Sequence, residues 1–183
     1  MSQTRQQIID LADQLIREKG YNAFSYKDIS SVLNIKNAAV HYHFPSKAEL
    51  GKAVIQQNWK DYTRELKKWD VLNPTQSLEA FIQVYEKLGS QGLVCFMGAM
   101  GAAYETLPEI MQSELTAASV EIRLWLRQVL RKGLETNEFH FTEKVEEKAD
   151  FIISALLSSL ILQRVTKENI PANVKSAILA SVK

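Results

Sequence analysis

The stretch SYKDISSVLNIKNAAVHYHFPSKAEL, residues 25–50, decides the fold of this chain. Ser25 and Asp28 have the spacing of a capping box, which begins a helix, and Asn34 tolerates the left-handed backbone of a tight turn. A second short helix is predicted from about residue 36 to residue 43, and a proline interrupts the chain soon after it. Two short helices joined by a tight turn and resting on a longer helix are typical of a helix-turn-helix.

The apolar residues of this stretch are predicted to bury the inner faces of the two short helices: Ile29, Val32, Leu33, Ile35 and Val40. The outward face of the second helix is then free to enter the major groove of DNA, which is wide enough for one α-helix. That face carries Lys36, Asn37, Ala39, His41, Tyr42 and His43. Its amide, imidazole, phenol and lysine groups suit base edges and phosphates. The same pattern also fits a solvated surface of a helical bundle, so the residues alone leave both interpretations open.

Outside this stretch the chain reads as one helix after another. Apolar stripes and capping signals predict further helices at about 4–19, 47–69, 76–88, 93–106, 108–135, 142–166 and 171–182. The first of these is expected to begin with a capping box of Thr4 and Gln7, and residues 134–141 to form an irregular connection. No hairpin signal interrupts the pattern. The prediction is an all-α fold of about nine helices, in which the fourth helix belongs to both the front and the back of the chain.

Residues 25–50 resemble the DNA-binding domain of the TetR family. That family combines a Ser or Thr, an Asp-Ile-Ala-like segment, a small turn, a recognition helix that ends in Tyr-x-His-Phe, and a following Ser-Lys-x-x-Leu. This chain departs from the pattern at His41, where the family has a tyrosine, and at Asn34, where it has a glycine. The resemblance implies an N-terminal three-helix helix-turn-helix domain at residues 1–50. A C-terminal helical bundle that binds an effector and dimerises would then occupy residues 51–183.

The resemblance also implies which residues contact DNA. Base edges would lie near Lys36, Asn37 and Ala39, at the start of the recognition helix. Lys27 would reach the groove or the backbone, and the phosphates would be contacted by Ser25, Tyr42, His43 and Lys47. The role of His41 stays open, because an imidazole replaces the family's phenol at that position.

The back two thirds of the chain offer a set of aromatic and sulfur-containing side chains. Such groups can line a mostly apolar pocket that contains a few polar groups, as small-molecule sites do. The candidates for effector binding are Trp59, Tyr62, Tyr85, Cys95, Phe96, Met100, Tyr104 and Trp125. Residues of this kind more often fill an ordinary core, and the effector could be a hydrophobic drug, a fatty-acid-like molecule or a reactive electrophile.

The segment GLVCFMGAMG, residues 92–101, resembles a Gly-Cys-x-x-Gly-type segment of some TetR-family members, a few of which sense oxidants or electrophiles through that cysteine. Sensing requires thiolate character, and hence a nearby cation or helix N-terminus. The apolar neighbours Val94, Phe96 and Met97 favour buried packing of Cys95 instead. Because Cys95 is the single cysteine, an intrachain disulfide is excluded.

Two strongly apolar helices are predicted at the C-terminus. Their apolar faces exceed what a 183-residue monomer needs to bury, and the resemblance implies a four-helix bundle across a two-fold axis. The candidate interface residues are Phe151, Leu156, Leu160, Ile161, Val174 and Ile178. Part of the 142–166 segment could instead be an internal core helix.

Composition and motifs exclude several other classes of protein. A chain with 46% apolar and 23% charged residues is typical of a folded globular protein. Its longest uncharged runs, residues 88–104 and 151–163, are shorter than the roughly 18–20 apolar residues that span a bilayer. We therefore expect a cytoplasmic protein that does not enter the membrane. No enzyme motif is present, and two histidines two positions apart make a poor metal pair, so no enzymatic activity, metal or cofactor is expected.

Two hypotheses follow from the sequence. In the first, a homodimer binds a palindromic operator in double-stranded DNA, acts as a repressor rather than an activator, and is released by a small molecule. In the second, a TetR-like module binds small molecules or proteins and has little specific affinity for DNA. The polar outward face of residues 37–43, together with Lys47, favours the first.

Overall fold

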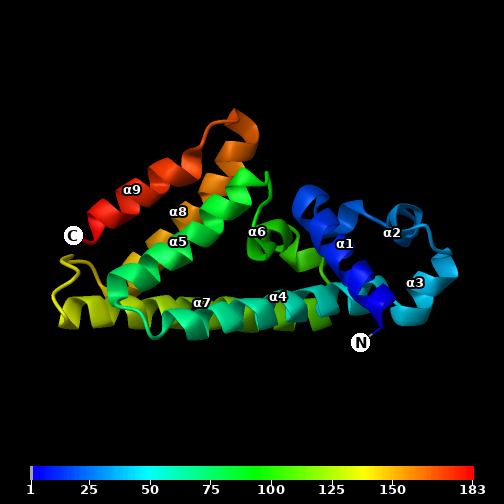
Figure 1. Cartoon of the computed structure of the whole chain (residues 1–183), viewed down its shortest axis with the longest axis horizontal. Coiled ribbons are helices and arrows are strands. Elements are labelled where there is room, and N and C mark those ends of the chain that lie inside the picture. The colour runs from blue at the N-terminus through cyan, green and yellow to red at the C-terminus, as the bar shows by residue number, and fades with distance from the viewer. Residues whose placement is uncertain (1) are drawn as a thin grey trace. The chain divides into compact units, whose positions relative to one another are not determined.

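The structure is a computed structural model that describes residues 2–183. These residues form nine α-helices and two short 3-10 helices, with no strand among them, which confirms the predicted all-α fold (Figure 1). The helices are α1 (Gln3–Lys19), α2 (Tyr26–Leu33), α3 (Asn37–His43), α4 (Lys47–Trp69), α5 (Pro74–Ser90), α6 (Phe96–Gly101), α7 (Glu109–Glu135), α8 (Val145–Thr166) and α9 (Ile170–Ser181), with the 3-10 helices η1 (Tyr21–Ala23) and η2 (Tyr104–Thr106).

The chain divides into two compact units. Unit 1 contains the residues up to Asp61 together with Phe96–Ala118, and unit 2 contains Tyr62–Cys95 and Ser119–Lys183. The long helices α4 and α7 each contribute to both units, as the sequence led us to expect for α4. Unit 1 thus holds α6 and the start of α7 besides the helix-turn-helix. The functional assignment to residues 1–50 and 51–183 remains a prediction.

Unit 1 has a core shared by α1, the helix-turn-helix and α4. Ile8 and Ile16 of α1, Ile29 of α2 and Val40 of α3 are completely buried. The guanidinium of Arg17 binds both the Asp13 carboxylate and the Asn58 amide, which ties α1 to α4. Helix α6 packs against α1 in the same unit.

The caps of the front helices follow the sequence signals with one exception. The backbone N–H of Ser25 donates to the Asp28 carboxylate at 2.7 Å, and Ser46 and Glu49 form a reciprocal capping box with both distances 3.2 Å. Asn34 has the predicted left-handed backbone, with φ 52°. The capping box predicted at Thr4 is wrong, because the Ser2 hydroxyl accepts from the backbone N–H of Arg5 at 3.3 Å, which places the N-cap of α1 at Ser2, two residues before Thr4.

Val32 does not face the core as predicted, since its side chain is 67% exposed. The buried face of α2 is formed by Tyr26, Ile29 and Ser30, while Leu33 is half-buried. At roughly 100° of rotation per residue, Val32 falls outside the face that these residues define. The spacing of the apolar residues from Ile29 onward does not predict that Val32 is exposed. The buried Tyr26 at the start of α2 moves the centre of the buried face away from Val32.

The helix predicted over residues 93–106 is also interrupted. Only Phe96–Gly101 is α-helical, and η2 follows after a turn. Gly92 has a left-handed φ of 69°, which a helix cannot continue through. Residues 92–101 contain three glycines, and each glycine lowers the stability of a continuous helix relative to other backbone conformations.

Unit 2 is built around α5, which lies beside α8 and α9 (Figure 1). Leu78, Phe81 and Ile82 of α5 are completely buried. The irregular connection predicted after α7 is confirmed at residues 136–144, where Phe139 packs so closely on Gly133 that any side chain there would overlap its ring. The buried Lys148 donates to the Glu143 carboxylate at 2.7 Å and to the Ser181 carbonyl at 3.1 Å, which joins the start of α8 to the end of α9.

Candidate DNA-binding surface, effector residues and interface

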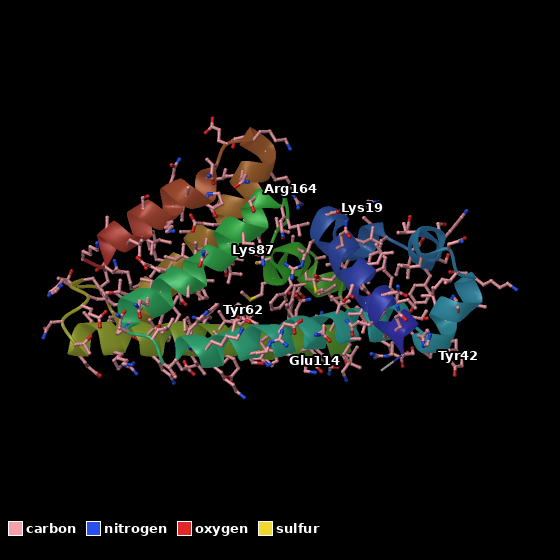
Figure 2. All side chains as sticks on the ribbon, in the orientation of Figure 1. Lys19, Tyr42, Tyr62, Lys87, Glu114 and Arg164 are labelled. Carbon is pink, nitrogen blue, oxygen red and sulfur yellow. The ribbon has the colours of Figure 1, made fainter. Side chains whose placement is uncertain are left out.

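Helix α3 presents the residues that were predicted to contact DNA. Val40 is completely buried and anchors α3 to the rest of unit 1. The side chains that remain accessible are Lys36, Asn37, Ala39, His41, Tyr42 and His43, of which Ala39 and His43 are half-buried. Tyr42 is 83% exposed and marks α3 in Figure 2. A short helix held by one buried anchor, with polar groups on its other faces, has the form that major-groove reading requires.

The imidazole of His41 is positioned by a residue of α2. Its ring meets the Tyr26 ring edge-on, with centroids 4.7 Å apart, and the Tyr26 hydroxyl donates to the Phe44 carbonyl at 2.8 Å. Burial raises the pKa of Tyr26 to about 12, so this phenol keeps its proton and its role as a donor. No local pattern predicts the Tyr26–His41 contact, because the two residues meet only when α2 and α3 pack together.

Ser25 is engaged within its own helix cap. Its hydroxyl donates to the Asp28 carboxylate at 2.7 Å, and the hydrogen bonds from Ser25 lower the pKa of Asp28. The capping role predicted for Ser25 is therefore confirmed. To donate to a DNA phosphate as well, the hydroxyl would have to exchange Asp28 for the phosphate. Lys27, the second residue of α2, is exposed.

Lys47, predicted to clamp a phosphate, points into unit 1. Its ammonium lies 4.7 Å from the centroid of the Tyr21 ring and 4.3 Å from that of Phe24, and it donates to the Phe24 carbonyl. Burial lowers the pKa of Lys47, and the Asp28 carboxylate acts against this shift. These contacts join the first turn of α4 to the segment before α2, so Lys47 stabilises the packing of the helix-turn-helix.

Arg5 is a cation near α3 that sequence reasoning missed. Its guanidinium lies over the Phe44 ring, 4.7 Å from the centroid. Phe44 directly follows α3, so this contact brings a positive charge from α1 to the end of the recognition helix. Only the tertiary structure brings these two residues together.

Three of the effector candidates of unit 2, Tyr62, Trp125 and Tyr85, belong to a continuous row of aromatic rings that also includes Trp69 and Phe81. Neighbouring centroids lie 5.5–6.0 Å apart along the row Tyr62, Trp69, Trp125, Phe81 and Tyr85. The Trp125 indole donates to the Asp70 carboxylate at 2.8 Å. Burial raises the pKa of both Tyr62 and Tyr85, and Cys95 contributes to each shift, so two phenols and one thiol share an apolar environment. Figure 2 marks Tyr62 on α4.

The other predicted effector residues belong to unit 1. Phe96 and Met100 are buried there, and the Tyr104 hydroxyl is hydrogen-bonded to Thr116 at 2.7 Å. Trp59 is half-buried on the part of α4 that belongs to the same unit. The eight candidates are therefore divided equally between the units, and their role in binding remains a prediction.

The interface candidates separate into exposed and buried residues. Phe151 and Ile161 are more than half exposed and Val174 is half-buried, whereas Leu156, Leu160 and Ile178 fill the core of unit 2. The sequence missed two residues of the exposed set, Leu162 and Val165. Together they form an apolar stripe along α8, made of Phe151, Ile161, Leu162 and Val165.

Helix α8 is also the one helix within residues 2–183 that is long and apolar enough to cross a membrane, judged by length and composition alone. This is weak evidence, because core helices of soluble proteins pass the same test. The inward-facing leucines and the exposed stripe together account for the apolar character of the helix.

An all-helical chain whose N-terminal helix-turn-helix exposes a polar recognition helix has the structure of a DNA-binding transcription regulator. Residues 8–54 match the model of the family described as bacterial regulatory proteins, tetR family. A TetR transcriptional regulator from Legionella pneumophila is 31% identical and superimposes with a TM-score of 0.88, over 100% of this chain and 99% of that one. The chain belongs to the TetR family of transcription regulators.

Two curated relatives carry names that describe repression. The chain is 22% identical over 171 residues to the HTH-type transcriptional repressor DhaR of a Mycobacterium strain, covering 91% of this chain and 85% of that protein. It is 34% identical over 82 residues to IcaR of Staphylococcus aureus, named as a negative transcriptional regulator of a biofilm operon. That second match covers 43% of this chain and 42% of IcaR.

Proposed function

We propose that this regulator is a homodimeric repressor that binds a palindromic operator and is released by a small molecule. The observation that carries the proposal is the exposed polar face of α3, fastened to unit 1 by the buried Val40. In a protein that no longer binds DNA, we would not expect a recognition helix that exposes this polar face. As a transcription regulator it would act in the cytoplasm, where bacterial DNA lies.

The proposed contacts with DNA fall into two classes. Asn37 and His41 would read base edges, because an amide and an oriented imidazole can pair with specific donors and acceptors in the major groove. Lys36 would lie near base edges at the start of α3, whereas Lys27 and Arg5 would contact phosphates, which adds affinity for every sequence. Ser25, Tyr42 and His43 would complete the backbone contacts.

The apolar stripe of α8 is the proposed dimer interface. Four large apolar side chains on one helix face are costly to leave in water, and a second copy of the same face would bury them in an isologous contact. Two copies of α3 would then meet successive major grooves, about 34–36 Å apart.

Release by an effector requires that the small molecule bind one conformation better than another. In unit 2, the phenols of Tyr62 and Tyr85 at the two ends of the row of aromatic rings, together with the thiol of Cys95, suit a mostly apolar molecule with one or two polar atoms. The relatives named as a repressor and as a negative regulator support repression of transcription rather than activation.

The test is selection of bound duplexes from a random DNA pool at about 150 mM salt, where non-specific phosphate binding is partly screened. We expect an enriched two-fold palindrome. Asn37→Ala should change the enriched sequence, whereas Lys27→Ala should weaken binding to all sequences and lower its salt dependence. Binding without any sequence preference would contradict the proposal and favour a binding module that has lost its operator.

A further inference from the structure

Tyr26 joins the start of α2 to the end of α3 through two contacts. It is the first residue of α2, and its ring meets the His41 imidazole edge-on, with centroids 4.7 Å apart. Its hydroxyl donates to the carbonyl of Phe44, which directly follows α3, at 2.8 Å. Because the ring and the hydroxyl of one side chain contact this segment three residues apart, the phenol has a fixed orientation relative to α3. The imidazole therefore packs on a ring that is itself held in place.

The two partners of this contact differ in their exposure to solvent. Tyr26 is 8% exposed, whereas His41 is an exposed residue of the recognition helix. The hydroxyl of Tyr26 is committed to Phe44, and burial raises the pKa of this phenol to about 12, so it remains a donor there. Tyr26 thus belongs to the core of unit 1, but it contacts a side chain of the proposed DNA-binding face.

An imidazole discriminates between bases only when its orientation is fixed. Its two ring nitrogens differ in their hydrogen bonding, and each has to align with a particular donor or acceptor at a base edge. A freely rotating side chain would lose rotamer entropy on binding and would adapt to more than one base. Packing against Tyr26 restricts that rotation before DNA binds, as a side chain that carries specificity requires.

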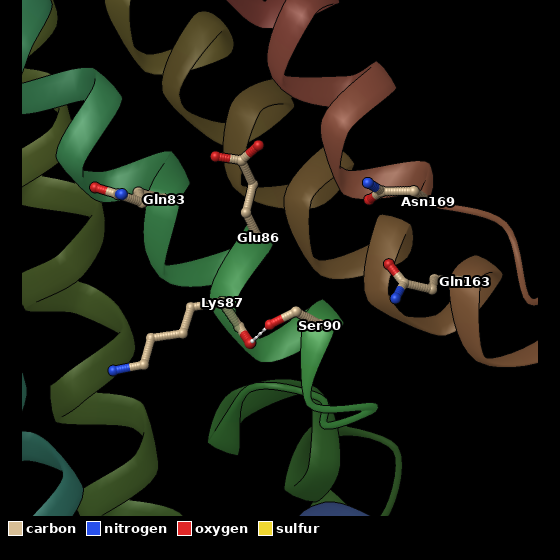
Figure 3. A pocket seen from close by; sticks show the side chains of 6 residues that line it. All are labelled: Gln83, Glu86, Lys87, Ser90, Gln163 and Asn169. Atoms are coloured by element: carbon tan, nitrogen blue, oxygen red, sulfur yellow. Dashed lines mark hydrogen bonds between the residues drawn. The ribbon is translucent and has the colours of Figure 1, made fainter.

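The polar groove of unit 2, where α5, α8 and α9 meet, contrasts with this face of α3 (Figure 3). Three of its lining side chains are bonded within unit 2. Gln163 donates to a backbone carbonyl of α5 at 2.7 Å, Glu86 pairs with Lys175 at 2.9 Å, and Ser90 donates to the Lys87 carbonyl at 2.8 Å. These bonds account for much of the polar lining as part of the packing of unit 2. On α3, by contrast, packing involves the ring of an exposed residue.

We propose that Tyr26 is a positioning residue that sets the sequence preference of the regulator at the base pair read by His41. The inference rests on the proposed function, because it requires that His41 reads a base edge. Tyr26 holds the imidazole in one rotamer, and the hydrogen bond to Phe44 holds Tyr26. Asn37 precedes His41 by about one turn of α3, or about 6 Å, which corresponds to about two base-pair steps. The two residues act at different base pairs, and only the position read by His41 depends on Tyr26.

The test is selection of bound duplexes from a random pool, followed by affinity measurements on the enriched site and its single-base changes. The base pair read by His41 is identified as the one whose preference is lost in His41→Ala. In Tyr26→Leu, we expect the preference at that base pair to fall at least about fivefold, while the preference at the Asn37 base pair is unchanged. Tyr26→Phe keeps the ring and should retain most of the preference. In the His41→Ala background, Tyr26→Leu should change no preference further.

Tyr21→Leu is the matched control. Tyr21 is another buried tyrosine of unit 1, 5% exposed, and it packs on Phe24 and Lys47. Its replacement removes a similar ring, so it should weaken binding to all sequences alike and leave the preferences at both base pairs unchanged. A purely structural role of Tyr26 would give the same result.

NMR spectra of the free protein provide a readout that needs no DNA. We expect nuclear Overhauser effects between the rings of Tyr26 and His41, and side-chain couplings of His41 that report one rotamer. In Tyr26→Leu these couplings should average over several rotamers. If Tyr26→Leu does not fold, Tyr26→Met replaces it, because the flexible methionine fills irregular space without supplying a ring.

Several results would overturn the proposal. They are rotamer averaging of His41 in the parent, loss of affinity for all sequences alike in Tyr26→Leu or in His41→Ala, and an effect of Tyr26→Leu on preference that persists without His41. An enriched palindrome whose preferences are unchanged in Tyr26→Leu overturns this inference alone. A parent protein that enriches no palindrome contradicts the proposed function, and the inference with it.

Discussion

At the scale of single residues, Lys47 shows how tertiary contacts can change the interpretation of a motif. The resemblance to the TetR family implies a phosphate contact, but the ammonium is held between the rings of Tyr21 and Phe24 and bonded to a backbone carbonyl. Two cation–π contacts at a half-buried site are worth about 1–2 kcal/mol together. In this environment Lys47 stabilises the fold whether or not DNA is bound.

Replacing Lys47 by Ala should therefore lower the free energy of unfolding by about 1–2 kcal/mol, because both ring contacts and the bond to Phe24 are lost. Lys47→Arg should recover most of the stability, since a guanidinium also stacks on aromatic rings. Urea unfolding measures the difference. Lys36→Ala is the control, because Lys36 is exposed and should affect DNA binding without affecting stability. If Lys47→Ala weakens DNA binding and leaves unfolding unchanged, the phosphate contact is its main role.

At the scale of elements, the turn after α7 depends on one glycine. A Cβ built on Gly133 would lie 1.9 Å from an atom of the Phe139 ring, and that ring is itself buried. The close approach lets the chain fold back over the end of α7 toward α8. Phe139 cannot move aside cheaply, because its side chain is itself only 2% exposed.

Gly133→Ala should accordingly destabilise the protein by about 1–3 kcal/mol through overpacking. The matched control is Gly101→Ala, at the end of α6, where a Cβ would meet no atom within 4 Å and the backbone is not left-handed. Helix propensity alone predicts that alanine is neutral or slightly stabilising there. Thermal unfolding of both variants is the measurement, and equal melting temperatures would show that the Phe139 ring yields to the added methyl group.

The same scale shows what helix periodicity can and cannot locate. The boundaries of α3, α7 and α9 follow the predicted ranges within a few residues, because capping residues and prolines act through local geometry. The segment from 93 to 106 does not, since its glycines leave the backbone free to follow its packing partners. Val32 is outside the core for a similar reason, because the buried face of α2 is set by Tyr26 and its neighbours in space.

At the scale of the whole molecule, the apolar stripe of α8 governs assembly. Leu162→Glu should dissociate the proposed dimer, because a charge buried in the centre of an isologous interface has no partner and appears twice. Light scattering after size-exclusion chromatography measures the mass. Val71→Glu is the control, since Val71 is also apolar and 84% exposed but lies far from α8 in the sequence. A parent protein that is monomeric, or a Leu162→Glu variant that remains dimeric, would show that the interface lies elsewhere.

The sequence by itself determined the all-α class, the helix-turn-helix and the outward residues of α3. These depend on capping boxes, on the left-handed turn at Asn34 and on short-range apolar spacing, all of which act within a few residues. The tertiary structure decided which of the C-terminal apolar residues are buried, since Leu156 and Phe151 have the same chemistry and differ only in what packs against them. It also decided that Lys47 faces two rings and that Tyr26 orients His41. These contacts join residues that are distant in sequence or lie on different helices, and no local pattern specifies them.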